Sequence, residues 1–187
     1  MKSLREYFEL EARLFQQIAF DRVDKVVAQL ERARVEGRRV FVFGNGGSAA
    51  TASHFACDLG KGTINPNRPR FKVHALTDSL PTLTAYANDM GYDVVFADPL
   101  ISHASRGDLA IAFSGSGNSP NVLRAMDTAA KLGLVTIGFT GFAGGKLKDG
   151  VEYHVNVPSD LMPQIEDVHL ALTHAACEIL KLEHAPH

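Results

Sequence analysis

The sequence lacks the features that would insert it into a membrane or export it. No apolar run approaches the ~20 residues that a transmembrane helix needs. The first residues, Met1–Glu6, lack the apolar core of a signal peptide. Only two cysteines occur, Cys57 and Cys177, and both lie in helix-like patterns, so we expect reduced thiols. We therefore expect a cytoplasmic protein with no membrane partner.

An excess of positive charge is also absent. The formal net charge is −2, so the chain has no basic footprint for nucleic acid, and we expect no nucleic-acid partner. Hydrophobic residues make up 45% and charged residues 21%, as in ordinary globular proteins. A length of 187 residues suffices for one α/β domain with a full core. We predict one domain over 1–187, with N-terminal helices over 1–37 and an α/β sandwich over 38–187.

The apolar pattern indicates two helices before residue 37 and alternating strands and helices after it. The predicted strands are 40–43, 71–76, 109–113, 134–139 and 153–157. The predicted helices are 48–59, 80–88, 94–105, 120–132 and 164–183. Strands separated by helices favour a parallel sheet covered on both faces. The N-terminal helices could cover the sheet of their own chain or form a bundle with a second copy.

Two short loops carry the strongest chemical signal. Gly44–Ser48 follows the apolar run 40–43, and Ser114–Pro120 follows the apolar run 109–113. Each loop opens a predicted helix, whose unpaired N–H groups and partial positive charge favour an anion. Both loops are also rich in hydroxyls, which suggests a ligand with a phosphate and several hydroxyl groups. The serines predicted to hold the phosphate are Ser48, Ser114, Ser116 and Ser119.

Two other phosphate motifs fit less well. Gly44–Ala49 matches the G-x-G-x-x-A turn of dinucleotide-binding folds, but the nearest acidic residue after the next strand is Asp78, beyond the usual spacing. A serine-rich second loop has no role in such a site. Neither loop carries the Gly-Lys-Ser/Thr ending of a P-loop.

Several motifs in order resemble the sedoheptulose 7-phosphate isomerase (phosphoheptose isomerase) family. They cover almost the whole chain and comprise Asn45–Ala50, His54–Leu59, Asn88–Tyr92, Ser116–Leu123, Thr136–Gly141, Val157–Ser159 and Ile165–His169 followed by His174. The resemblance implies the sugar isomerase (SIS) fold, a five-stranded parallel sheet between helices. It also implies a homotetramer, with a dimer as the alternative, and active sites between subunits.

The chemistry that the resemblance implies is an aldose–ketose isomerisation through an enediol, most simply of sedoheptulose 7-phosphate to a heptose 7-phosphate. It assigns acid–base catalysis to Asp58 and His174. It assigns a metal, predicted to be Zn²⁺, to His54, Asp58, Glu166 and His174. Predicted substrate contacts are Asn45, Gly46, Gly47, Ser48, Asn88, Asp89, Ser114, Gly115, Ser116, Ser119 and Glu166.

Local spacing supports only part of this set. His54 and Asp58 are four apart and share a helix face, whereas Glu166 and His174 are eight apart, roughly 12 Å along a helix. Alone, His174 would be a buried histidine in an apolar stretch, and His169 could hydrogen-bond nearby instead.

The chain departs from the family pattern around the sugar. Asp58 replaces a glutamate, Glu166 a glutamine, Gly62 an arginine, Gly115 a threonine and Pro163 an aspartate. The alternative function is a non-catalytic phosphosugar-binding or DnaA-binding SIS protein. Ionisable groups at both Asp58 and His174 favour catalysis.

Overall fold

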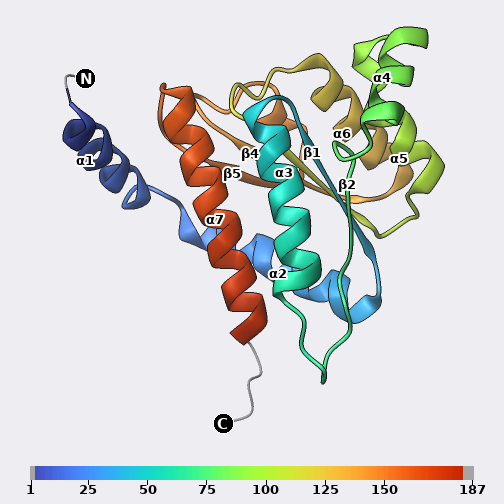
Figure 1. Cartoon of the computed structure of the whole chain (residues 1–187), viewed down its shortest axis with the longest axis horizontal. Coiled ribbons are helices and arrows are strands. Elements are labelled where there is room, and N and C mark those ends of the chain that lie inside the picture. Colours follow the sequence, from blue (N-terminus) through green and yellow to red (C-terminus); the bar gives the residue numbers. More distant parts are fainter. Residues whose placement is uncertain (1–2, 183–187) are drawn as a thin grey trace.

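The computed structural model describes residues 3–182, and its strands form one five-stranded parallel sheet (Figure 1). The strands are β1 (Arg39–Gly44), β2 (Lys72–Ala75), β3 (Leu109–Ser114), β4 (Val135–Thr140) and β5 (Tyr153–Asn156). Their order is β2-β1-β3-β4-β5, and every neighbouring pair is parallel. The predicted fold class is confirmed.

Helices cover both faces of this sheet. They are α1 (Leu4–Phe15), α2 (Phe20–Glu36), α3 (Gly47–Cys57), α4 (Leu80–Asp89), α5 (Ala97–His103), α6 (Pro120–Leu132) and α7 (Met162–Leu182). Helices α2, α3 and α7 share one apolar core with the sheet, and α5 and α6 share the other (Figure 1). Both faces of the central strands are therefore buried, which explains why β1 and β3 are continuous apolar runs rather than alternating ones. Among residues 3–182, no helix has the length and apolar content that crossing a membrane requires.

The two N-terminal helices differ in how they pack. Helix α2 packs on β5, α7 and β1 of its own chain and buries Val26, Val27 and Leu30. Helix α1 packs on α7 and buries only Leu14. Helix α2 thus covers the sheet of its own chain, whereas much of the apolar surface of α1 stays exposed.

Three predicted helix boundaries differ from the structure. The region 94–105 contains a 3₁₀ turn (Tyr92–Val94) and the shorter α5, because Pro99 has no N–H to bond the Val95 carbonyl. The segment predicted as helix 48–59 is α-helical to Cys57 and continues as a π-helical turn, Asp58–Gly62. Helix α7 begins at Met162 instead of 164, and the predicted end at 183 lies outside the described residues.

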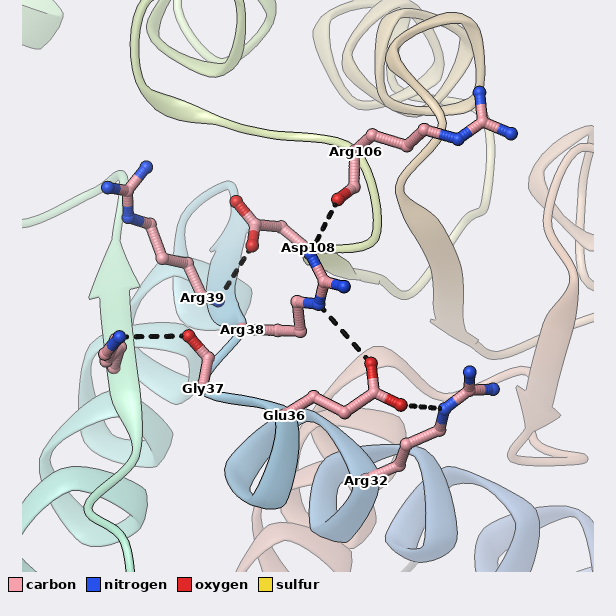
Figure 2. Close-up of polar contacts among 8 residues, drawn as sticks. Arg32, Glu36, Gly37, Arg38, Arg39, Arg106 and Asp108 are labelled. Atoms are coloured by element: carbon pink, nitrogen blue, oxygen red, sulfur yellow. Dashed lines mark hydrogen bonds and ion pairs between the residues drawn. The ribbon is translucent and has the colours of Figure 1, made fainter.

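Charged groups close the amino end of the sheet, opposite the Gly/Ser loops. The buried carboxylate of Asp108 accepts hydrogen bonds from the backbone N–H groups of Arg39 and Ser105, at 2.9 and 2.8 Å. Figure 2 shows Asp108 beside the exposed Arg32–Glu36–Arg38 ion pairs. These contacts fix the starts of β1 and β3 relative to each other.

Candidate active site

The strand order places the two Gly/Ser loops side by side. Strands β1 and β3 are neighbours, with Gly44 paired to Phe113, so the loops that follow them leave the same edge of the sheet. From β1 the chain adds β2 on one side and then β3 on the other, so the strand order reverses between β1 and β3, the usual ligand position of open parallel sheets. Gly46 precedes α3 with a left-handed φ of +55°, which a glycine adopts without strain.

A cavity of about 240 Å³ lies between the two loops and the start of α7. Its lining contains nine of the predicted substrate residues together with Phe113 and Met162. The nine are Asn45, Gly46, Gly47, Ser48, Ser114, Gly115, Ser116, Ser119 and Glu166.

Serine hydroxyls in this cavity are available to a ligand. The Ser114 hydroxyl is buried and has no hydrogen-bond partner. Ser119 is the N-cap residue of α6, yet its side chain makes no capping hydrogen bond. Ser116 Oγ accepts only the backbone N–H of Asn118. Buried hydroxyls in proteins are nearly always paired, so the unpaired Ser114 hydroxyl is an exception that a bound ligand would explain.

Asn121 and Tyr92 brace the first loop and were not predicted as site residues. The Asn45 and Asn121 side-chain amides are 2.9 Å apart in a reciprocal pair, and the Tyr92 hydroxyl donates to Asn45 Oδ1 at 2.9 Å. Asn121 is also buried. The sequence signals for Asn121 were its place in the Ser116–Leu123 motif and an amide directly after the proline that opens α6.

The predicted pair Asn88 and Asp89 lies outside the cavity lining. Both are exposed at the end of α4, where Asn88 donates to Asp89 Oδ1 at 2.7 Å. Of the motif Asn88–Tyr92, it is Tyr92 that contacts a cavity residue, through its hydrogen bond to Asn45.

Parallel helices α3 and α7 bring His54, Asp58 and His174 together. His54 Nε2 lies 3.2 Å from Asp58 Oδ2 and 3.1 Å from His174 Nε2, and His174 Nε2 lies 3.6 Å from the same Oδ2. Asp58 opens the π-helical turn, a distortion that often occurs at functional sites. The two histidine side chains are 50% and 47% exposed.

This group fits the predicted zinc ion in geometry and chemistry. Bonds of about 2.0–2.1 Å in a tetrahedron separate neighbouring ligand atoms by about 3.3 Å. The three observed separations, 3.1, 3.2 and 3.6 Å, bracket that value. Two imidazoles and a carboxylate, with one position left open, are a typical catalytic zinc set.

Glu166 does not join this group in the described residues. Its carboxyl lies in the cavity against Gly47, where an added Cβ would collide with it. Gly47 is seven residues before His54, about 10 Å along α3. Glu166 therefore lines the cavity beside the loop residues, and its assignments as a substrate contact and as a ligand of the same zinc remain predictions.

His169 is a buried core histidine. Its Nε2 lies 3.1 Å from the Thr140 carbonyl, and its ring lies beside Phe113 and Phe139. Burial lowers the pKa of His169 to about 4, so the ring is neutral at pH 7. The partner is on β4, 29 positions away, and not a nearby residue of the same helix as the sequence suggested.

Comparison with known proteins agrees with this architecture. The SIS domain family matches residues 6–141. The probable phosphoheptose isomerase of Thermoplasma acidophilum is 36% identical over 94% of this chain and 96% of its own length. The phosphoheptose isomerase of Mycobacterium tuberculosis is 45% identical over 80% of this chain and 74% of its own.

Two solved structures show the same fold along nearly the whole chain. A phosphoheptose isomerase from Francisella tularensis superposes with a TM-score of 0.89 at 27% identity, covering 96% of this chain and 97% of that one. The phosphoheptose isomerase from Neisseria gonorrhoeae superposes with a TM-score of 0.88 at 29% identity, covering 95% and 96%. This chain belongs to the SIS-domain family of phosphoheptose isomerases.

Proposed function

We propose that the chain is an aldose–ketose isomerase that converts sedoheptulose 7-phosphate to a heptose 7-phosphate through an enediol. One observation carries the proposal: the unpaired Ser114 hydroxyl lies in a cavity at the β1/β3 edge, one side of which is the start of α3, the helix that carries His54 and leads into the turn with Asp58. The enzyme names of its relatives favour catalysis over the non-catalytic alternative.

The cavity is suited to the phosphate. The amino ends of α3 and α6 direct backbone N–H groups and partial positive charge toward it. Hydroxyls of Ser48, Ser114 and Ser119 add donors. The sugar then extends along α3 toward His54 and Asp58.

Asp58 and His174 are suited to move the proton between adjacent sugar carbons. Both imidazole contacts of Asp58 use Oδ2, which leaves Oδ1 to accept a proton. An imidazole can both donate and accept a proton, so His174 can return a proton to the neighbouring carbon. Zinc bound by His54, Asp58 and His174 would polarise the sugar carbonyl.

The same proposal includes a cytoplasmic homotetramer, with a dimer as the alternative. The half-exposed histidines support this assembly, because a second copy over α3 and α7 would exclude water from the reacting carbons.

The test is isomerisation of C5 to C7 ketose phosphates by purified protein in D₂O. We expect deuterium at the carbon beside the carbonyl in the product of one substrate. Asp58→Asn and His174→Ala should each lower turnover by about 10²–10⁴-fold, the contribution of a positioned acid or base. An exposed lysine variant, Lys131→Gln, serves as the matched control. Failure to exchange deuterium with any of these sugars would refute the proposal.

A further inference from the structure

A second cavity, of about 630 Å³, lies on the face of the sheet that α5 and α6 cover. Residues of β1 and β2, of the start of α4 and of the end of α5 line it. It shares no lining residue with the cavity between the Gly/Ser loops. Because pockets of about 300–1,000 Å³ commonly hold small molecules, its size suits a ligand that the isomerase proposal does not include.

The lining of this second cavity favours an anion. It contains three basic side chains and, among the described residues, no carboxylate. The basic side chains are Arg39, His74 and His103. Hydroxyls of Ser79 and Thr82 lie beside them at the start of α4. The cavity thus offers positive charge and hydrogen-bond donors together.

Arg39 supplies a permanent positive charge with donors to spare. Its Nη1 donates to the His103 carbonyl at 2.6 Å, which holds the guanidinium at the end of α5. The Asp108 carboxylate binds the backbone N–H of Arg39 (Figure 2), and within residues 3–182 the Arg39 side chain forms no ion pair. A guanidinium carries several N–H donors in a planar fork that matches a phosphate. The remaining donors of Arg39 are therefore available to a phosphate group.

His74 supplies a flat surface in the same cavity. Its ring stacks on Phe41, with ring centroids 5.6 Å apart and an angle of 24° between the planes. Phe41 is 1% exposed whereas His74 is exposed, so the core supports one face of the imidazole and the other face is accessible. An aromatic ring held in this way is suited to stacking with a flat heterocycle.

We propose that this cavity binds a nucleoside phosphate, with its phosphate on Arg39 and its base stacked on His74. The Ser79 and Thr82 hydroxyls, 2.7 Å apart, add donors and acceptors for the ribose. Inorganic phosphate would use only the charge, and a nucleoside only the ring, so the combination selects a nucleotide over either part. The inference is independent of the isomerase proposal, because the two cavities share no residue.

The test is calorimetric titration of the intact protein with AMP, and with adenosine and inorganic phosphate as its parts. Arg39→Gln should weaken AMP binding by about tenfold or more, because hydrogen bonds to a charged group are lost. His74→Ala should weaken it by about fivefold or more, the usual effect of removing a side chain on which a base stacks. Arg39→Lys keeps the charge and should recover part of the affinity.

Two controls assign the binding to this cavity. Arg32→Gln changes an exposed arginine that pairs with Glu36 and does not line the cavity, so it should bind AMP like the wild type. Ser114→Ala/Ser119→Ala weakens the proposed phosphate site between the Gly/Ser loops and should also keep its AMP affinity. In that double variant AMP should bind at least about tenfold more tightly than adenosine or inorganic phosphate, because it uses both the charge and the ring. Circular dichroism checks the fold of every variant.

Four results would overturn the inference. The first is no binding of AMP to the wild type, and the second is an unchanged affinity in Arg39→Gln. The third is loss of AMP binding in Ser114→Ala/Ser119→Ala, which would place the nucleotide between the Gly/Ser loops. The fourth is equal affinity for AMP and inorganic phosphate in that double variant, which would show that the base makes no contact. The isomerase proposal would stand in each case, because its test does not involve Arg39 or His74.

Discussion

Single hydroxyls are decisive for the phosphate site that we propose. Ser114 is 5% exposed and its oxygen has no partner, an arrangement that costs free energy unless a ligand compensates for it. Ser119 occupies a capping position without capping. At both residues the fold has left hydrogen-bonding capacity unused in the same cavity.

We expect the double variant Ser114→Ala/Ser119→Ala to bind sedoheptulose 7-phosphate at least tenfold more weakly. Each lost hydrogen bond to a charged group costs about 1.5–3 kcal/mol. Calorimetry measures the affinity, and circular dichroism checks the fold. Ser102→Ala, an exposed serine on α5 whose hydroxyl bonds the Asp98 carbonyl, should bind normally. Unchanged affinity in the double variant would place the phosphate elsewhere.

A second residue-scale effect concerns pH and the buried ring of His169. Its folded-state pKa of about 4 lies below the ordinary value of 6.5, so below pH 6.5 the unfolded chain gains a proton that the folded chain excludes. Folding stability should therefore fall as pH drops from 6.5 toward 4, by about 1.4 kcal/mol per pH unit.

His169→Gln should remove most of that dependence, because the amide can still donate to the Thr140 carbonyl but does not titrate. Urea unfolding at pH 7 and pH 5 measures the difference. The loss of stability between these pH values should be about 2 kcal/mol larger for the wild type. Identical pH slopes in both proteins would show that His169 takes up a proton while folded.

At the scale of elements, the sequence predicted all five strands to within two residues at each end. Runs such as 40–43 and 109–113 are apolar throughout and end in glycine or serine, so their limits are local properties. The 3₁₀ turn before α5 was missed, although Pro99 was a visible reason for it. The π-helical turn at Asp58 depends on tertiary packing and left no comparable signal.

The candidate site also has some features that local sequence predicts and others that depend on tertiary packing. Serine and glycine content identified both loops, and helix spacing paired His54 with Asp58. The contact of Asn45 with Asn121 joins residues 76 positions apart, because strand order makes β1 and β3 neighbours. Nothing local in the sequence encodes that order, so the contacts of Asn121 and Tyr92 with Asn45 and the position of Glu166 against Gly47 could not be predicted.

The hydrogen bonds of Asp108 connect the starts of β1 and β3, and they give a prediction about these two strands. Asp108 is 3% exposed and satisfies the N–H groups of Arg39 and Ser105 (Figure 2). Asp108→Ala leaves two backbone donors unpaired, which should lower the free energy of unfolding by about 2–4 kcal/mol. Asp108→Asn keeps one acceptor and should lose less. Urea denaturation measures both.

The control for the Asp108 variants is Glu36→Gln, which changes the exposed ion pairs beside Asp108. Surface pairs of this kind contribute little, so its unfolding midpoint should stay near that of the wild type. If Asp108→Ala were as stable as this control, the Asp108 hydrogen bonds would not contribute to holding the two strands together.

At the scale of the whole molecule, the apolar surface is unevenly distributed. The sheet is covered on both faces, yet α1 lies at the edge against α7 (Figure 1), where Tyr7 donates to Asp167 at 2.5 Å. On the outer side of α1, Leu4 is 80% and Phe8 is 61% exposed, and the two are one helical turn apart. An amphipathic helix with an uncovered apolar stripe is suited to packing against the same helix of another copy.

We therefore expect the double variant Leu4→Glu/Phe8→Glu to form a smaller assembly than the wild type. Two charges on this stripe would have to be buried unpaired in a helical bundle between copies, and burying an unpaired charge is strongly unfavourable. Sedimentation at matched concentrations measures the mass. Ile101→Glu is the control, since Ile101 is exposed on α5, a helix that packs on the opposite face of the sheet. It should assemble like the wild type. Because α1 buries only Leu14 within its own chain, the variant's helix content should change little. An unchanged mass for the double variant would show that α1 is not the contact between copies.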